Sequence, residues 1–127
     1  MITNKPNGIG LTRLRNATIC SIKGFRAAFK HESAFRQELF LCLVLLPLSF
    51  FVAKDMGTWL ILVISMLFLL FAEIVNSAIE ALADRITLEH SELIGRAKDM
   101  GSACVFIAFS ILVLVWVYAF VILYNLS

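Results

Sequence analysis

The sequence predicts an all-α membrane protein with three transmembrane helices and an N-terminal amphipathic helix on the membrane surface. The chain has 127 residues, is 61% hydrophobic and has a mean hydropathy of +0.91, which is too apolar for an ordinary soluble domain. Its apolar residues form three long runs separated by short polar segments, and seven of its eleven lysines and arginines precede the first run. The length suits a single membrane domain over residues 1–127.

The surface helix is predicted over residues 10–30. Apolar residues recur there at steps of three and four, while the basic residues fall mostly on other faces. A basic amphipathic helix of this kind suits an anionic inner leaflet. A simple topology signal would explain the same charges. The apolar face contains Leu11, Leu14, Ile22, Phe25 and Phe29.

Three transmembrane helices are predicted over 34–53, 58–83 and 100–123, with a polar loop over 84–99. The apolar run Leu39–Ala53 would span only about 22 Å, so the first of these helices must begin earlier, near Ser33. Pro47 is a candidate bend. The segment 54–57 is a short turn.

The distribution of basic residues sets the expected orientation. The N-terminal segment has seven lysines and arginines, the 84–99 loop has three, the 54–57 turn has one, and the C-terminus has none. By the positive-inside rule, the N-terminus and the 84–99 loop face the cytoplasm, and the C-terminus faces outward. The chain has no apolar segment near residue 1, so we expect no cleavable signal peptide.

A polar stripe enters the second predicted span from its cytoplasmic end. Glu73, Asn76, Glu80 and Asp84 are separated by three, four and four residues, so they share one face of a helix. A charge near the bilayer centre costs roughly 2.5–3.5 kcal/mol on insertion scales, so the stripe must face protein or water. It indicates a site for cations and their polyanionic ligands, and self-association is the simplest way to shield it.

The other groups needed for phosphoryl transfer lie near the same membrane edge. Two carboxylates can hold Mg²⁺ together with water and phosphate oxygens, and Glu32 would lie at headgroup depth beside the stripe. Arg96 and Lys98 provide positive charge for a phosphate. The P-loop, dinucleotide and protein-kinase motifs are absent, so a nucleotide site here would be built differently. A cation-coupled transporter or a non-catalytic subunit would also explain a buried acidic stripe.

Three blocks of sequence resemble the small prokaryotic diacylglycerol kinases. Residues 73–85 read Glu-Ile-Val-Asn-Ser-Ala-Ile-Glu-Ala-Leu-Ala-Asp-Arg. Residues 24–38 read Gly-Phe-Arg-Ala-Ala-Phe-Lys-His-Glu-Ser-Ala-Phe-Arg-Gln-Glu, and residues 89–103 read Glu-His-Ser-Glu-Leu-Ile-Gly-Arg-Ala-Lys-Asp-Met-Gly-Ser-Ala. Their order and spacing match, so the resemblance covers nearly the whole chain.

The resemblance implies a homotrimeric kinase of the bacterial inner membrane that moves the γ-phosphoryl of Mg-ATP onto diacylglycerol, giving phosphatidic acid and ADP. It implies that Glu73 is the general base, that Glu32 and Glu80 hold Mg²⁺, and that sites form between protomers. It implies no nucleic-acid partner. The implied ATP-binding residues are Arg13, Cys20, Glu32, Glu80, Glu89, His90, Ser91, Lys98 and Asp99. The implied substrate-binding residues are Arg13, Ser21, Arg26, Phe35, Arg36, Gln37, Glu38, Glu73, Asn76 and Ser102.

A second lipid kinase shares this architecture. Undecaprenol kinases resemble the chain in much of the same motif, although Asp84-Arg85 and the segment 98–103 look more like the diacylglycerol branch. Turnover of the two lipid alcohols would separate them. A transporter would instead produce cation flux in vesicles without a phosphorylated lipid.

Overall fold

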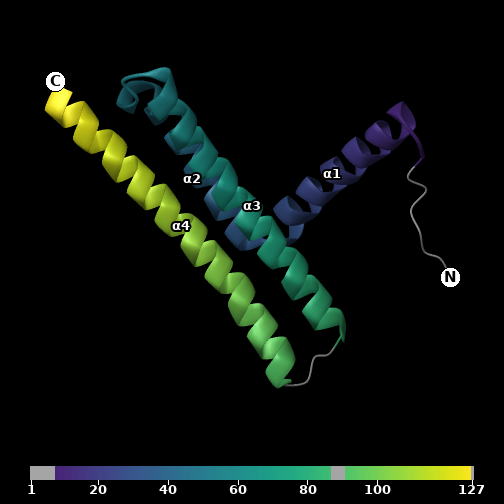
Figure 1. The fold of residues 1–127 in the computed structure, drawn as a ribbon. Helices are drawn as coiled ribbons and strands as arrows, with labels where there is room; N and C mark the ends of the chain where they lie inside the picture. Colours follow the sequence, from purple (N-terminus) through teal and green to yellow (C-terminus); the bar gives the residue numbers. More distant parts are fainter. Residues whose placement is uncertain (1–7, 87–90, 127) are drawn as a thin grey trace.

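The computed structural model describes residues 8–86 and 91–126, and all regular structure in this part of the chain is helical (Figure 1). Helix α1 spans Leu11–His31, α2 Ser33–Val52, α3 Met56–Ile86 and α4 Glu92–Leu126. Three of them, α2, α3 and α4, are long and apolar enough to cross a membrane. The predicted all-α class with three spans is therefore confirmed.

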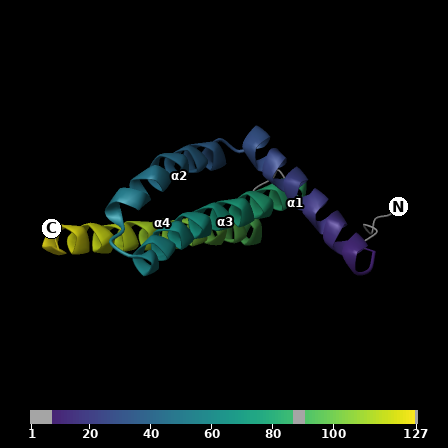
Figure 2. The same cartoon turned by 90° about the horizontal axis from the view of Figure 1, so that it is seen from above.

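The helices form a bundle from which α1 projects. Helix α3 packs chiefly along α4, and α2 packs on α3 with fewer contacts to α4. Helix α1 contacts mainly α2 and leaves the bundle obliquely, which places the first turn of α1 far from the last turn of α4 (Figures 1 and 2). At one end of the bundle, α3 finishes and α4 begins. Helix α1 projects from the side of the bundle at this end.

The polar segment predicted as a loop over 84–99 needs correction. Helix α3 continues to Ile86, and α4 begins at Glu92, eight residues before the predicted start of the third span. Charged residues end a hydrocarbon-spanning segment because they need water, but they do not end a helix. The sequence has no proline between residues 84 and 99, and both helices extend past their apolar parts.

The core lies where α2, α3 and α4 meet. Its residues are fully or nearly buried, and Leu62, Leu69 and Ala108 have no exposed surface. Small side chains on α4 allow that helix to approach α3 closely. The buried hydroxyl of Ser65 donates to the carbonyl of Leu62 in its own helix, so it needs no partner elsewhere. The core cluster comprises Cys42, Val52, Leu62, Met66, Leu69, Ala72, Ala108, Leu112, Trp116 and Ala119.

Replacing Leu69 by Ala should lower the thermal stability of the bundle. The substitution leaves a cavity at a site with no exposed surface, and core Leu→Ala changes cost about 2–5 kcal/mol in soluble proteins. We expect a loss at the lower end of that range, because in soluble proteins part of the cost comes from transferring the buried side chain from water. Thermal unfolding in detergent checks this, and Leu67→Ala, on the exposed face of α3, should change it little.

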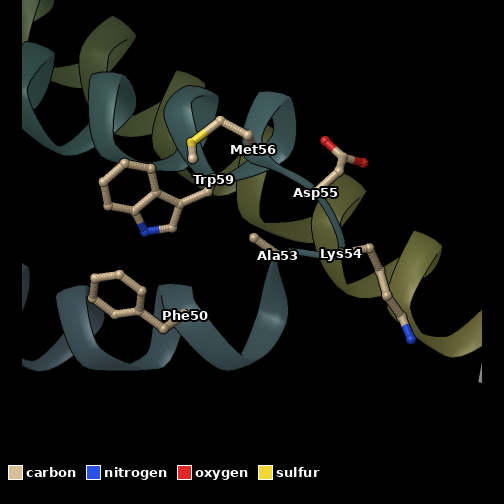
Figure 3. Close-up of a pocket in the computed structure, with 6 residues that line it drawn as sticks. All are labelled: Phe50, Ala53, Lys54, Asp55, Met56 and Trp59. Atoms are coloured by element: carbon tan, nitrogen blue, oxygen red, sulfur yellow. The ribbon is translucent and has the colours of Figure 1, made fainter.

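The turn between α2 and α3 is fixed by side-chain hydrogen bonds. Asp55 accepts from the backbone N–H of Thr58 at 2.8 Å, which satisfies one free donor at the start of α3. The indole N–H of Trp59 donates to the hydroxyl of Ser49 on α2 at 3.0 Å, and its ring lies 5.3 Å from the ring of Phe50. Figure 3 shows these rings facing each other while Lys54 and Asp55 point away. The pocket here, about 330 Å³, contains none of the predicted site residues.

The junction between α1 and α2 is a single extended residue, Glu32, with φ −114° and ψ 105°. The guanidinium of Arg36 reaches back from α2 and donates to the carbonyls of Phe29, at 2.6 Å, and Lys30, at 3.2 Å. The last carbonyls of a helix lack partners within the helix, so Arg36 supplies them. This contact fixes the carboxyl end of α1 against α2.

Candidate functional site

The polar stripe of α3 is buried at its inner end. Glu73 is 4% exposed and Asn76 9% exposed, whereas Glu80 is half-buried and Asp84 is exposed. The stripe therefore runs from the packed interior of the bundle to its surface. A carboxyl group in such a place needs a proton or a partner, because desolvation opposes an isolated charge.

The carboxyl group of Glu73 has its partner on α2. Its side chain is in hydrogen-bond contact with that of Glu38, and the two groups repel when both are charged. The contact joins α2 to the inner end of the polar stripe on α3. One oxygen of Glu38, Oε2, is buried without a hydrogen-bond partner. The sequence analysis gave Glu38 only as an implied substrate-binding residue and did not predict this contact, which depends on how two separate helices pack.

Asn76 contacts α4 rather than α2. Its side-chain oxygen Oδ1 is buried without a hydrogen-bond partner and lies against Gly101. An unpaired buried acceptor costs about 1–3 kcal/mol, so native proteins seldom leave one without a reason. Here the oxygen is enclosed by the close approach of α4 at Gly101.

Lys98 on α4 lies beside the surface end of the stripe. The ammonium of Lys98 lies 2.6 Å from Oδ1 of Asp84, and Glu80, one turn away on α3, also attracts it. Both members of the ion pair are well exposed, at 40% and 58%, so the pair adds little stability. The ion pair instead places a positive charge beside two carboxylates at the surface end of the stripe.

The two predicted metal ligands sit at different places. Glu32 is half-buried at the α1–α2 junction, and Glu80 is half-buried on α3. Within residues 8–86 and 91–126, no group of three or more His, Cys, Asp or Glu side chains could hold a metal ion. Carboxylates suit Mg²⁺, which commonly takes one or two of them and fills its remaining positions with water and phosphate. The donor chemistry of Glu32 and Glu80 therefore fits Mg²⁺ only with ligands from elsewhere.

Two apolar pockets border α1. One, of about 590 Å³, lies between α1, α2 and α3, and its lining includes Arg26, Lys30 and the buried Phe35. The other, of about 410 Å³, includes Ser21 and shares Phe25 and Leu70 with the first. Apolar walls with a few polar groups at the rim suit an acyl chain attached to a polar headgroup. The structure thus gathers Ser21, Arg26 and Phe35, three of the predicted substrate-binding residues, around one apolar region.

The remaining predicted site residues are spread more widely. Arg36 caps the end of α1, and the hydroxyl of Ser21 donates to the carbonyl of Ala17 at 3.0 Å. Glu89 and His90 lie outside the described residues. Exposed positions are occupied by Arg13, Gln37, Asp99 and Ser102, and half-buried positions by Cys20 and Ser91.

The comparisons with known proteins agree on one family. The family model described as "Prokaryotic diacylglycerol kinase" matches residues 19–120. A diacylglycerol kinase of Haemophilus influenzae is 48% identical over 107 residues, which cover 84% of this chain and 91% of that protein. Those of Pseudomonas aeruginosa and Escherichia coli K12 are 44% and 46% identical, covering 84% and 87% of this chain and 87% and 90% of theirs. With most of its length matched at these identities, the chain belongs to the prokaryotic diacylglycerol kinase family.

Proposed function

We propose that this protein is an ATP-dependent diacylglycerol kinase, which transfers the γ-phosphoryl of Mg-ATP to the free hydroxyl of diacylglycerol and releases phosphatidic acid and ADP. Family membership supports the reaction class. The observation that supports the site is the carboxyl group of Glu73, 4% exposed and in contact with Glu38 on a helix long enough to cross a membrane.

In the proposed reaction, Glu73 acts as general base. It takes the proton of the lipid hydroxyl as that oxygen attacks the γ-phosphorus, and the bond from this phosphorus to the β–γ bridging oxygen breaks to release ADP. Glu38 holds the Glu73 carboxyl in place through their contact. Asn76, three residues along the same face, would help orient the reacting groups from its buried position.

On the nucleotide side, Lys98 leaves or shares its ion pair with Asp84 and contacts phosphate oxygens. Mg²⁺, when bound, neutralises phosphate charge. Glu32 and Glu80 are the residues that would hold it together with those phosphates. Arg13, Cys20, Glu89, His90, Ser91 and Asp99 complete the proposed ATP-binding set.

The proposed assembly is a homotrimer in the bacterial inner membrane. Its N-terminus and the residues between α3 and α4 face the cytoplasm, and the C-terminus faces the periplasm. The single chain exposes many apolar side chains on α4, among them Phe106, Leu114 and Val117, and these would face lipid or another copy. Sites between protomers would give Glu32 and Glu80 the further ligands that one chain does not bring together.

The test is a lipid kinase assay on the purified protein in mixed detergent micelles, with radiolabelled ATP, Mg²⁺ and either diacylglycerol or undecaprenol. We expect labelled phosphatidic acid. Product from undecaprenol alone would favour the second kinase class. If neither lipid is labelled and vesicles containing the protein show cation flux, the transporter would replace the proposal.

Removing Mg²⁺ should abolish lipid phosphorylation without unfolding the protein. Positioning and charge neutralisation account for most of the rate enhancement in phosphoryl transfer, and the ammonium of Lys98 at the surface end of the stripe is already paired with Asp84. We expect activity to fall to background with excess EDTA and to return when Mg²⁺ is restored. Circular dichroism should stay unchanged throughout. Undiminished turnover in EDTA would contradict the roles of Glu32 and Glu80.

A further inference from the structure

The closest approach of α4 to the polar stripe of α3 is made by Gly101. A Cβ atom added at this residue would overlap the side-chain oxygen of Asn76 and would lie 3.5 Å from its Cγ. Gly95, on the same helix, has no such neighbour among the described residues, because a Cβ there would meet none of their atoms within 4 Å. Gly101 is therefore needed for a local contact, and Gly95 is not.

Packing, not a protein hydrogen bond, holds the amide oxygen of Asn76. Asn76 is 9% exposed, and its Oδ1 has no hydrogen-bond partner. The neighbours of the space above Gly101 are the amide itself and, at 3.6 Å, Cδ1 of Ile79. A side chain packed this tightly has little room for another rotamer, so the backbone of α4 decides where the amide lies.

We propose that Gly101 is a positioning residue for Asn76: because it has no side chain, it leaves the space that the amide oxygen fills, and so fixes where the amide lies on the polar stripe beside Glu73. The inference rests on the proposed function only for its effect on lipid phosphorylation. The contact itself does not depend on that function. Any side chain at residue 101 would turn the amide away or push α4 from α3.

A double-mutant cycle on activity tests the link between the two residues. We expect Gly101→Ala to lower kcat on the order of tenfold or more, the scale of effects from a reacting group misplaced by about 1 Å. Gly95→Ala, the matched control, should stay within about twofold of the unsubstituted protein, because its Cβ meets no atom of the described residues. In the Asn76→Ser background, Gly101→Ala should cause no further loss, since the shorter side chain leaves room for the added methyl. Losses that multiply, or full activity in Gly101→Ala, would overturn the proposal.

Thermal unfolding in detergent provides a readout independent of chemistry. Gly101→Ala should lower the unfolding temperature, and Asn76→Ser in the same chain should restore much of the loss by removing the overlap. If both single and double variants are equally unstable, Gly101 serves helix packing alone and the proposal fails. Should the unsubstituted protein phosphorylate no lipid, the proposed function would fall, while this thermal cycle would still decide whether Gly101 positions Asn76.

Discussion

Replacing Glu73 by Gln is expected to lower lipid phosphorylation at least about a hundredfold, the lower end of the usual contribution of a general base. Gln keeps the size and the hydrogen-bonding capacity of the side chain but cannot take a proton from the lipid hydroxyl. The amide can still contact Glu38, so the helices should pack as before. Initial rates at saturating Mg-ATP and lipid, together with the unfolding temperature, check both statements.

Two controls make the result specific to Glu73. Glu92→Gln removes a carboxylate from the exposed first turn of α4 and should leave the rate nearly unchanged. Glu38→Gln should reduce the rate less than Glu73→Gln, because Glu38 contacts the base and does not take the proton. Equal activity of the Glu73→Gln variant and the unsubstituted protein would remove Glu73 from the chemistry. A larger loss at Glu38 would exchange the two roles.

Replacing Lys98 by Met is expected to lower kcat/KM for Mg-ATP by about ten- to a hundredfold, since hydrogen bonds to charged groups contribute about 1.5–3 kcal/mol. The substitution removes the ammonium beside Glu80 and Asp84 while keeping a long unbranched side chain. The KM for diacylglycerol should change little. Steady-state kinetics with each substrate varied in turn would measure this difference.

Asp84→Asn distinguishes phosphate binding from a structural ion pair. If Lys98 acts on phosphate, freeing it from Asp84 should leave kcat/KM for Mg-ATP within a few-fold of the unsubstituted protein or improve it. The pair is exposed at both ends, so its loss should barely change the unfolding temperature. Equal losses from Lys98→Met and Asp84→Asn would mean that the ion pair itself is what the enzyme needs.

Local pattern was enough to predict the helices and the polar stripe. The steps between Glu73, Asn76, Glu80 and Asp84 require a shared helical face, and long apolar runs require spans. The pattern did not reveal which helix meets which member of that face. Glu38 meets Glu73 and Gly101 meets Asn76 only because α2 and α4 approach α3 at particular registers.

The sequence misjudged the segment around residues 84–99 for a different reason. A mixture of charges marks where hydrocarbon ends, and the prediction treated that boundary as the end of the helix. The structure extends α3 to Ile86 and begins α4 at Glu92, which brings Lys98 onto a helix where Asp84 can reach it. The hydrogen bonds of Arg36 to the end of α1 were not predicted either, because a guanidinium bound to carbonyls two turns earlier in the chain leaves no periodic signal.

The unequal lengths of the helices have a consequence for the surrounding lipid. Helix α2 has 20 residues and measures about 30 Å, close to the thickness of a bilayer's hydrocarbon layer, whereas the 31 residues of α3 measure about 46 Å. Lipids with longer acyl chains form a thicker hydrocarbon layer, which would immerse the polar first turns of α2 or make the helix tilt less. A thinner layer would leave those turns in the headgroup region or make the helix tilt more. Since Glu38 lies in those turns, we expect bilayer thickness alone to tune the speed of the enzyme.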